Sequence, residues 1–472
     1  MLFNTLEYFF FFIFVFTVAW VTAGHSRFRI LFLLVASLYF YASNNGWQTC
    51  LLLLTTTIDY LVCLGLAKTG NEKKRRYLLL ISVVSNIGML CYFKYANFFA
   101  DSLIKIAASM DIQLSWVTLN VALPLGISFY TFEALSYTID VYRREIPVER
   151  DWSRLAFLVT FFPHLIAGPI IRAADFFPQM NQRTTVSHVE FERAIFLIAC
   201  GLVKKVVLAD QLSFFADAAF NDPAAVGTMR TWFGIYAFAF QIYFDFSGYS
   251  DIAIGCAKLL GFTLPDNFRR PYAATSITDF WRRWHISLSS WLRDYLYIPL
   301  GGNRMPTKAG VYRNLMLTML LGGLWHGAAW TFVLWGAIHG FYLSVERALG
   351  IGRTMSGDNS SLLVRLVVIL LTFHLILLCW ILFRAESLER IGQMLKVMFA
   401  YNSGPQPTAG LVLFGAVMLF AWLWQLVRDR WEVTNYWINR PLPVKAITYA
   451  ATGVLVLVIG SDVPKSFIYF RF

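Results

Sequence analysis

Residues 362–383 read LLVRLVVILLTFHLILLCWILF, an almost uninterrupted apolar run that holds one arginine and one histidine. An apolar helix of about 20 residues is long enough to cross the hydrocarbon core of a bilayer. Similar runs occupy Leu2–Val21, Leu31–Ala42, Cys50–Leu66, Tyr77–Phe93, Leu411–Leu426 and Ala446–Ile459. The sequence therefore predicts an all-α, polytopic integral membrane protein. Because no basic residue precedes the first run, we expect a retained span there and not a cleaved signal peptide.

The composition supports this class. Hydrophobic residues make up 58% of the 472 residues and charged residues only 14%, whereas a soluble domain typically carries about a quarter charged residues. The net charge of +12 comes from basic residues in short loops between the runs, which is typical of cytoplasmic loops and not of nucleic-acid binding. The six cysteines lie far apart and form no CxxC pair, so we expect neither a disulfide nor a metal site.

The first loops predict the orientation of the chain. His25–Arg29 carries two arginines, Ser43–Gln48 carries no charge, and Lys68–Arg76 holds five basic residues against Glu72. Loops rich in Lys and Arg stay on the cytoplasmic side. We therefore expect the N-terminus outside and the Lys73–Arg76 cluster in the cytoplasm.

The middle of the chain contains broken helices. Glycine and proline interrupt Leu123–Gly126, Phe161–Pro169 and Leu321–Gly327, and such backbone is tolerated in a membrane only where protein buries it or it lines a cavity. We expect one membrane domain over residues 1–472, with N-terminal spans in 1–122, a core in 123–350 and C-terminal spans in 351–472, after a loop at Gly350–Ser361. No internal repeat is visible, which weighs against a transporter.

The segment Ser276–Tyr297 reads SITDFWRRWHISLSSWLRDYLY. Ser276 and Asp279 form a capping box, which predicts that a helix begins there. Aromatic residues recur every three or four positions, and Arg282 and Arg293 would share the opposite face of a continuous helix. This pattern predicts a helix along the membrane interface. Either the helix only anchors the chain, or its arginines attract an anionic cytosolic ligand such as a nucleotide phosphate.

His326 lies in the apolar stretch NLMLTMLLGGLWHGAAW, Asn314–Trp330, with glycines on both sides. A buried imidazole at membrane depth is costly unless it is hydrogen-bonded or used, and the pattern alone leaves both readings open. On a continuous helix His339 would point to nearly the opposite face, so we expect it not to share a site with His326. We expect structural roles for His164 and His374.

Charged and hydroxyl groups also interrupt two other apolar segments. Lys204, Lys205 and Asp210 fall within Ala194–Ala218, and QIYFDFSGYSD holds Asp245, Ser247, Ser250 and Asp251. Charged groups at such depth usually face a protein interior or a water-filled cavity. The carboxylates could serve in acid–base chemistry, in helix–helix hydrogen bonds or in pairing with an arginine of the 276–297 segment.

Several long blocks, in order along the chain, resemble the membrane-bound O-acyltransferase family, most closely its bacterial exopolysaccharide branch. They are LPLGISFYTFEALSYTIDVYR (Leu123–Arg143), FFPHLIAGPIIR (Phe161–Arg172), QIYFDFSGYSDIAIG (Gln241–Gly255), DFWRRWHISLSSWLRDYLYIPLGGNR (Asp279–Arg304), LLGGLWHGAAW (Leu320–Trp330) and FIYFRF (Phe467–Phe472). The resemblance implies that His326 is catalytic and that His285 is supportive or also essential. It also implies a ring of about 10–12 tilted transmembrane helices, with re-entrant and interfacial helices, around a central tunnel that joins the two faces.

The resemblance further implies an O-acetyltransferase of the bacterial inner membrane. It would pass acetyl from cytosolic acetyl-CoA across the membrane for O-acetylation of an exported polysaccharide, of alginate or cellulose type. The acceptor would be the sugar itself or, as we favour, a serine of an exported acetyltransferase partner within a polysaccharide synthesis and secretion complex. A multi-pass channel or transporter, or a non-catalytic scaffold of such a complex, would explain the topology but not the ordered blocks.

The residues expected at this site follow from the chemistry. Neutral His326 would act as general base, which typically contributes about 10²–10⁴-fold. An oxyanion donor would come from Trp325 or from a backbone N–H near Gly322–Gly327. The donor's phosphates would contact Arg282, Arg283, Lys204 or Lys205. Asp245, Ser247 and Asp251 are candidates for the tunnel wall, and no metal is expected.

Overall fold

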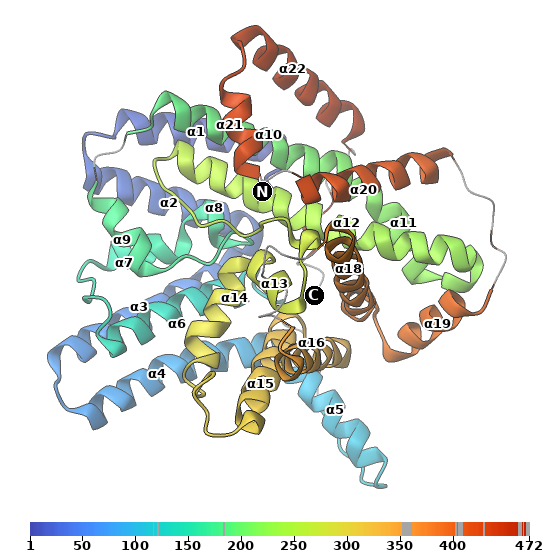
Figure 1. The fold of residues 1–472 in the computed structure, drawn as a ribbon. Helices are drawn as coiled ribbons and strands as arrows, with labels where there is room; N and C mark the ends of the chain where they lie inside the picture. Colours follow the sequence, from blue (N-terminus) through green and yellow to red (C-terminus); the bar gives the residue numbers. More distant parts are fainter. Residues whose placement is uncertain are drawn as a thin grey trace. The chain divides into compact units, whose positions relative to one another are not determined.

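The computed structural model describes residues 1–116, 118–119, 122–182, 185–351, 361–401, 404, 409–427, 430–460, 465 and 467–468 (Figure 1). Over these ranges the chain forms helices joined by turns, without any strand, which confirms the all-α prediction. The chain divides into two compact units. Unit 1 comprises Met1–Phe191 with Cys256–Pro265, and unit 2 comprises Glu192–Gly255 with Asp266–Phe472.

Unit 1 begins with the predicted apolar helices. They are α1 (Leu6–Val21), α2 (Ser26–Asn45), α3 (Thr49–Lys68) and α4 (Glu72–Leu90), which continues through the π-helical turn η2 (Cys91–Tyr95) into α5 (Ala96–Ala108). The side chain of Asn71 caps α4 by accepting from the backbone N–H groups of Lys73 and Lys74. Because Ser, Thr, Asp and Asn favour this position, the helix begins just before its basic cluster.

The broken region of unit 1 consists of short helices, as predicted. These are α6 (Ile127–Arg143), α7 (Trp152–Thr160), α8 (Phe162–Leu165) and α9 (Ala173–Asn181). Gly126, with a φ of +75°, begins α6 where any Cβ would lie 2.8 Å from the carbonyl oxygen of Leu165. His164 is buried, with Nε2 3.0 Å from the oxygen of Leu158 and Nδ1 3.6 Å from a carboxylate oxygen of Glu133. These contacts fit the structural role expected for His164.

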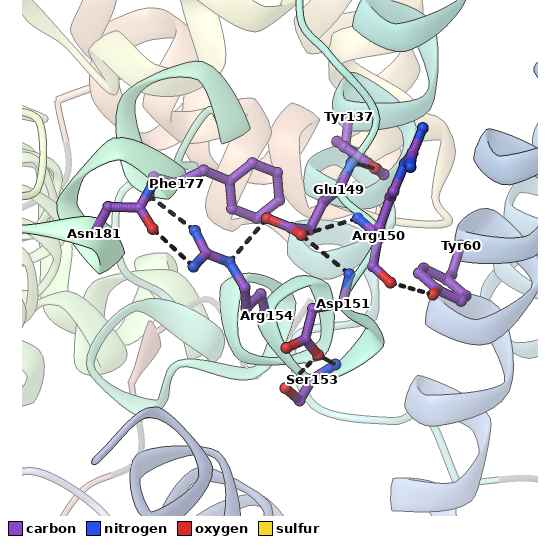
Figure 2. Close-up of polar contacts among 9 residues, drawn as sticks. All are labelled: Tyr60, Tyr137, Glu149, Arg150, Asp151, Ser153, Arg154, Phe177 and Asn181. Atoms are coloured by element: carbon purple, nitrogen blue, oxygen red, sulfur yellow. Dashed lines mark hydrogen bonds and ion pairs between the residues drawn. The ribbon is translucent and has the colours of Figure 1, made fainter. Parts of the chain in front are cut away.

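Glu149 organises the loop between α6 and α7 (Figure 2). One of its carboxylate oxygens accepts from the backbone N–H groups of Arg150 and Asp151, at 2.9 and 3.0 Å. The other accepts from Nε of Arg154 at 2.8 Å, and Nη1 of Arg154 donates to Asn181 on α9. This network ties the loop to the short helices that come after it.

Unit 2 contains all of the candidate site residues. Its first part consists of most of α10 (His188–Leu202), the π-helical turn η3 (Val203–Ala209), α11 (Asp210–Asn221) and most of α12 (Pro223–Leu259). There follow η4 (Pro271–Ala273), α13 (Ile277–Arg283), α14 (Ile286–Leu292), η5 (Arg293–Tyr297), α15 (Lys308–His326) and α16 (Trp330–Leu349). α15 and α16 pack side by side (Figure 1).

The last part of unit 2 contains α18 (Leu362–Arg384), α19 (Leu388–Phe399), α20 (Ala409–Val427), α21 (Arg430–Ile438) and α22 (Leu442–Ile459). Within the described part of the chain, five helical segments are long and apolar enough to cross a membrane: Ser26–Lys68, Glu72–Ala108, α18, α20 and α22. The predicted runs are thus confirmed as helices. The predicted loop at Gly350–Ser361 falls largely outside the described residues.

The prediction of one continuous helix over Ser276–Tyr297 was wrong. The helix begins where expected, because the Ser276 hydroxyl accepts from the N–H of Asp279 at 3.0 Å. It ends at Arg283, however, and the chain breaks at Trp284 and His285 before α14 begins. Its aromatic residues, Trp281, Trp284, Trp291 and Tyr295, are buried. They therefore pack inside the protein, and the shared face predicted for Arg282 and Arg293 does not exist.

Candidate active site

His326 is positioned by the close packing of α15 and α16. Its helix ends at His326, and Gly327 continues in extended backbone toward the start of α16. A Cβ on Gly323 would collide with the carbonyl oxygen of Phe332 and lie 3.2 Å from Cα of Gly336. Small residues of this kind let membrane helices approach closely. The glycines beside His326 therefore bring the two helices together and set the imidazole against α16.

Aromatic rings surround the imidazole of His326. The ring centroids of Trp325 and Trp335 lie 5.0 Å away and that of Phe383 lies 5.1 Å away, all in edge-on geometry. Only 5% of His326 is exposed. The imidazole is thus buried among aromatic side chains of α15, α16 and the end of α18.

His285 occupies the break between α13 and α14. It is fully buried, and its backbone is left-handed, with φ +42° and ψ +56°. For a residue other than glycine this conformation costs about 1–2 kcal/mol and is typical of functional sites. Its ring lies 4.6 Å from Phe246 and 5.9 Å from Trp325.

The two histidines share Trp325 as a neighbour. Because its ring centroid lies 5.9 Å from that of His285 and 5.0 Å from that of His326, the two imidazoles are at most about 11 Å apart, the sum of these distances. The structure therefore brings together the two histidines that the sequence singled out, with Trp325 in contact with both.

His339, which we expected not to share a site with His326, has one aromatic neighbour in common with it. Trp335 contacts both imidazoles, His326 at 5.0 Å and His339 at 4.5 Å. The reason is the break after His326, because α16 folds back along α15 and the helical spacing no longer applies. The indole N–H of Trp281 donates to Nδ1 of His339 at 3.3 Å. His339 and Trp281 thus extend the same aromatic cluster.

Sequence reasoning also missed Asn267, which holds the break at His285. Its side-chain oxygen accepts from the backbone N–H of Ser287 at 3.1 Å and from the hydroxyl of Ser287 at 2.8 Å. Its carbonyl oxygen accepts from the N–H of Ile286 at 3.0 Å. A fully buried asparagine in this position satisfies the first N–H groups of α14. A lone asparagine in a loop gave no signal of this role.

The basic residues expected at the donor's phosphates differ in their surroundings. Arg282 is exposed and makes no hydrogen bond or ion pair with the residues described. Arg283, in contrast, pairs with Asp279 at 2.8 Å, and Lys204 pairs with Asp251 at 2.7 Å. Arg282 is therefore the candidate that remains available to a ligand.

Lys205 forms the centre of a buried charge cluster. Its ammonium group lies 2.9 Å from a carboxylate oxygen of Asp210 and 2.6 Å from one of Asp245. The acidic residues of α12 thus pair with lysines of η3, and not with an arginine of the 276–297 segment. The other candidate of this stretch, Ser247, is buried, and its hydroxyl has no hydrogen-bond partner among the described residues.

The cluster also anchors residues near the C-terminus. The backbone N–H of Ile468 donates to Asp245 at 2.6 Å, and Phe467 packs on Phe246, 5.4 Å between centroids. Phe246 is the ring that contacts His285. Phe467 therefore packs against the ring that contacts His285. Most of the FIYFRF block lies outside the described residues.

Over the ranges that the structure describes, no group of three His, Cys, Asp or Glu side chains could hold a metal ion. The site consists instead of buried imidazoles, indoles and phenyl rings, with charge pairs behind them. Such an arrangement suits proton transfer by an imidazole that is shielded from water.

Comparison with known proteins identifies the family. The model of the membrane-bound O-acyltransferase family matches residues 77–382. The chain is 45% identical over 410 residues to the probable alginate O-acetylase AlgI of Pseudomonas aeruginosa, covering 85% of this chain and 76% of that relative. It is 46% identical over 384 residues to the same-named protein of Azotobacter vinelandii, covering 80% and 74%.

A peptidoglycan O-acetyltransferase of Helicobacter pylori is 37% identical over 406 residues, covering 80% of this chain and 75% of that relative. The matched region contains His285, His326 and His339, and it contains both α15 and α16. The helices long and apolar enough to span a bilayer agree with this family. The chain belongs to the membrane-bound O-acyltransferase family, and it is a multi-pass membrane O-acyltransferase.

Proposed function

We propose that this protein takes acetyl from cytosolic acetyl-CoA and passes it to an acceptor on the outer side of the bacterial inner membrane, for O-acetylation of an exported polysaccharide of the alginate type. The observation that carries the proposal is the burial of His326 among aromatic rings, one of which, Trp325, also contacts His285. The names of the relatives, alginate O-acetylase at 45% identity and peptidoglycan O-acetyltransferase at 37%, support O-acetylation of a polymer outside the cell.

The chemistry assigns His326 the role of general base. Its neutral imidazole takes the proton of the acceptor hydroxyl as that oxygen attacks the thioester carbonyl carbon. The carbon–sulfur bond then breaks, the thiolate of CoA takes up the proton, and the acetyl ester remains on the acceptor. Positioned proton transfer of this kind typically contributes about 10²–10⁴-fold, and the aromatic walls exclude the water that would hydrolyse the thioester.

The charge distribution of unit 2 supports an orientation for this site. Phe383 at the end of α18 contacts His326 at the end of α15, so these two helices run in the same direction. Because α16 folds back along α15, the start of α15, the end of α16 and the start of α18 lie at the same end of this group of helices. That end carries the basic residues Arg304, Lys308, Arg313, Arg347 and Arg365. Basic ends stay in the cytoplasm. His326 would then lie about 27 Å from Lys308, the length of α15, toward the outer side.

The donor would enter from the basic end. Arg282 is exposed there, on a helix whose first N–H groups, those of Ile277 and Thr278, donate to Glu346 near the end of α16. A free guanidinium suits the phosphates of an acyl carrier cofactor. Arg283, Lys204 and Lys205 have carboxylate partners, so we assign them to holding the protein together and Arg282 to the donor.

The acceptor would arrive from the other side. We propose that it is a serine of an exported acetyltransferase partner, which then acetylates the polymer within a synthesis and secretion complex. We also propose that the N-terminus lies outside the cytoplasm, in keeping with the basic residues Arg27 and Arg29 at the start of α2 and Lys73–Arg76 at the start of α4. A channel or a non-catalytic scaffold would not account for membership of an O-acyltransferase family.

The test is a strain whose chromosomal copy carries His326→Ala. We expect the polymer to be secreted at normal yield but without acetyl esters in its NMR spectrum. His374→Ala is the matched control, because His374 also lies in a membrane-spanning helix. Its side chain hydrogen-bonds to Tyr236 at 2.7 Å, away from the aromatic rings around His326. Acetyl esters that persist in the His326→Ala strain would refute the site, and loss of the polymer itself would favour a scaffold.

A further inference from the structure

Two tryptophans of unit 2 bury an indole N–H that has no acceptor. Trp335 and Trp380 are each 1% exposed, and the Nε1 atom of each lacks a hydrogen bond within the described part of the chain. Other indoles of the protein do have acceptors: Trp20, Trp152, Trp232, Trp281, Trp422 and Trp437. An unsatisfied buried donor typically costs about 1–3 kcal/mol. Such a group therefore requires an explanation.

Only one of the two indoles lies against His326. The ring of Trp335 is 5.0 Å from the imidazole and inclined by 83° to it. Trp380 packs instead on Trp284 and Phe383, at 5.0 and 5.4 Å, and has no ring contact with His326. A hydrogen-bond donor on a ring beside the general base is close to the carbon that the acceptor oxygen would attack, and the carbonyl oxygen on that carbon needs such a donor.

We propose that the indole N–H of Trp335 donates the hydrogen bond that stabilises the oxyanion in acyl transfer. This inference rests on the proposed role of His326 and deepens it. When the acceptor oxygen attacks, the π electrons of the thioester carbonyl move to its oxygen, which accepts from Nε1–H of Trp335. When the intermediate collapses, those electrons re-form the carbonyl, the carbon–sulfur bond breaks, and the thiolate takes the proton held by His326. The indole keeps its own proton throughout.

The surroundings of Trp335 fix the indole before substrate binds. Its ring contacts His339 at 4.5 Å, Phe383 at 5.6 Å and Trp281 at 5.7 Å. The next residue, Gly336, lies so close to the backbone of Met319 on α15 that no Cβ would fit. A donor held rigidly in a water-poor site stabilises developing charge without reorganisation. In this assignment Trp335 takes the role that sequence reasoning gave to Trp325.

The experiment replaces the N–H and keeps the shape. Trp335 is exchanged for β-(3-benzothienyl)alanine, in which sulfur takes the place of N–H, and in parallel for phenylalanine as Trp335→Phe. In purified protein with labelled acetyl-CoA we expect kcat to fall about 10²–10³-fold, the usual effect of removing one oxyanion donor. The KM for acetyl-CoA should stay unchanged, because the ground state does not need this bond.

Trp380 provides the matched control. The same exchange there also removes a buried N–H without an acceptor, but away from His326, so kcat should remain that of the wild type. A benzothienyl variant at position 335 with unchanged kcat would overturn the oxyanion assignment, whatever Trp335→Phe does to folding. Retained turnover in His326→Ala would instead overturn the proposed function, so the two failures are distinguishable.

Discussion

Neighbouring glycines on α15 offer a sharp test of how the site is assembled. In Gly323→Ala the new methyl group would collide with the carbonyl oxygen of Phe332 and approach the backbone of Gly336. Both contacts are to backbone, so the helices must separate by about 1 Å to reach ordinary van der Waals distance. Overpacking of this kind costs about 1–3 kcal/mol. A 1 Å displacement of Trp335 relative to His326 can lower turnover by about 10²-fold.

Gly322→Ala is the control that isolates this effect. Among the described residues, the only neighbour within 4 Å of a Cβ at Gly322 is one methyl carbon of Leu292, at 3.2 Å, which belongs to a flexible side chain. Alanine also has the higher helix propensity, by about 1 kcal/mol. We expect Gly322→Ala to keep its turnover and its unfolding temperature in detergent, whereas Gly323→Ala loses both. Equal turnover in the two variants would refute assembly of the site by the α15–α16 contact.

Two further predictions concern the charged groups of unit 2. Lys205→Met removes the ammonium group between the buried carboxylates of Asp210 and Asp245. Because breaking such a cluster typically costs about 3–5 kcal/mol, the unfolding temperature in detergent should fall clearly. An unchanged unfolding temperature would contradict the pairing. Arg282→Ala removes an exposed guanidinium that has no partner among the described residues, so the KM for acetyl-CoA should rise with kcat unchanged. The rise in KM should be smaller at high salt, because salt screens the phosphates. An unchanged KM would exclude this arginine from the donor site.

The membrane-depth helices could be predicted because their signal is local. The run Leu362–Phe383 differs from α18 by one residue, Arg384, and the helix begins directly after Ser361, whose hydroxyl accepts from the N–H of Val364. In a bilayer each backbone polar group must be satisfied within its own segment. Length and apolarity therefore suffice, and no knowledge of the neighbouring helices is needed.

The break at His285 could not be predicted because its cause is distant in the sequence. The aromatic residues of Ser276–Tyr297 keep their three- and four-residue spacing across the break, so the pattern favours a continuous helix. The broken form is held by Asn267, which binds the N–H groups of Ile286 and Ser287. No residue within the segment signals that contact, nor the left-handed backbone that His285 adopts between the two helices.

The shared position of His326 and His339 was predictable in part. Gly323 before the break, and Gly336 and Gly340 after it, are small residues of the kind that lets membrane helices pack closely. Taken together, these glycines indicate a hairpin and place His339 on the face toward α15. Treating the stretch as one helix hid that signal.

The buried polar groups of unit 2 fall into two kinds, and the difference bears on which of them act in catalysis. The charged groups are compensated: the buried Lys205 has two carboxylates, and the half-buried Lys204 and Arg283 pair with Asp251 and Asp279. An uncompensated charge at this depth would cost far more than a neutral donor. The fold does tolerate a neutral N–H that has no acceptor among the described residues, at both Trp335 and Trp380, and at Trp335 a substrate oxygen would supply the acceptor. We therefore expect the paired charges to determine stability and the unpaired indole beside His326 to determine turnover, and the exchange at position 335 separates these two contributions.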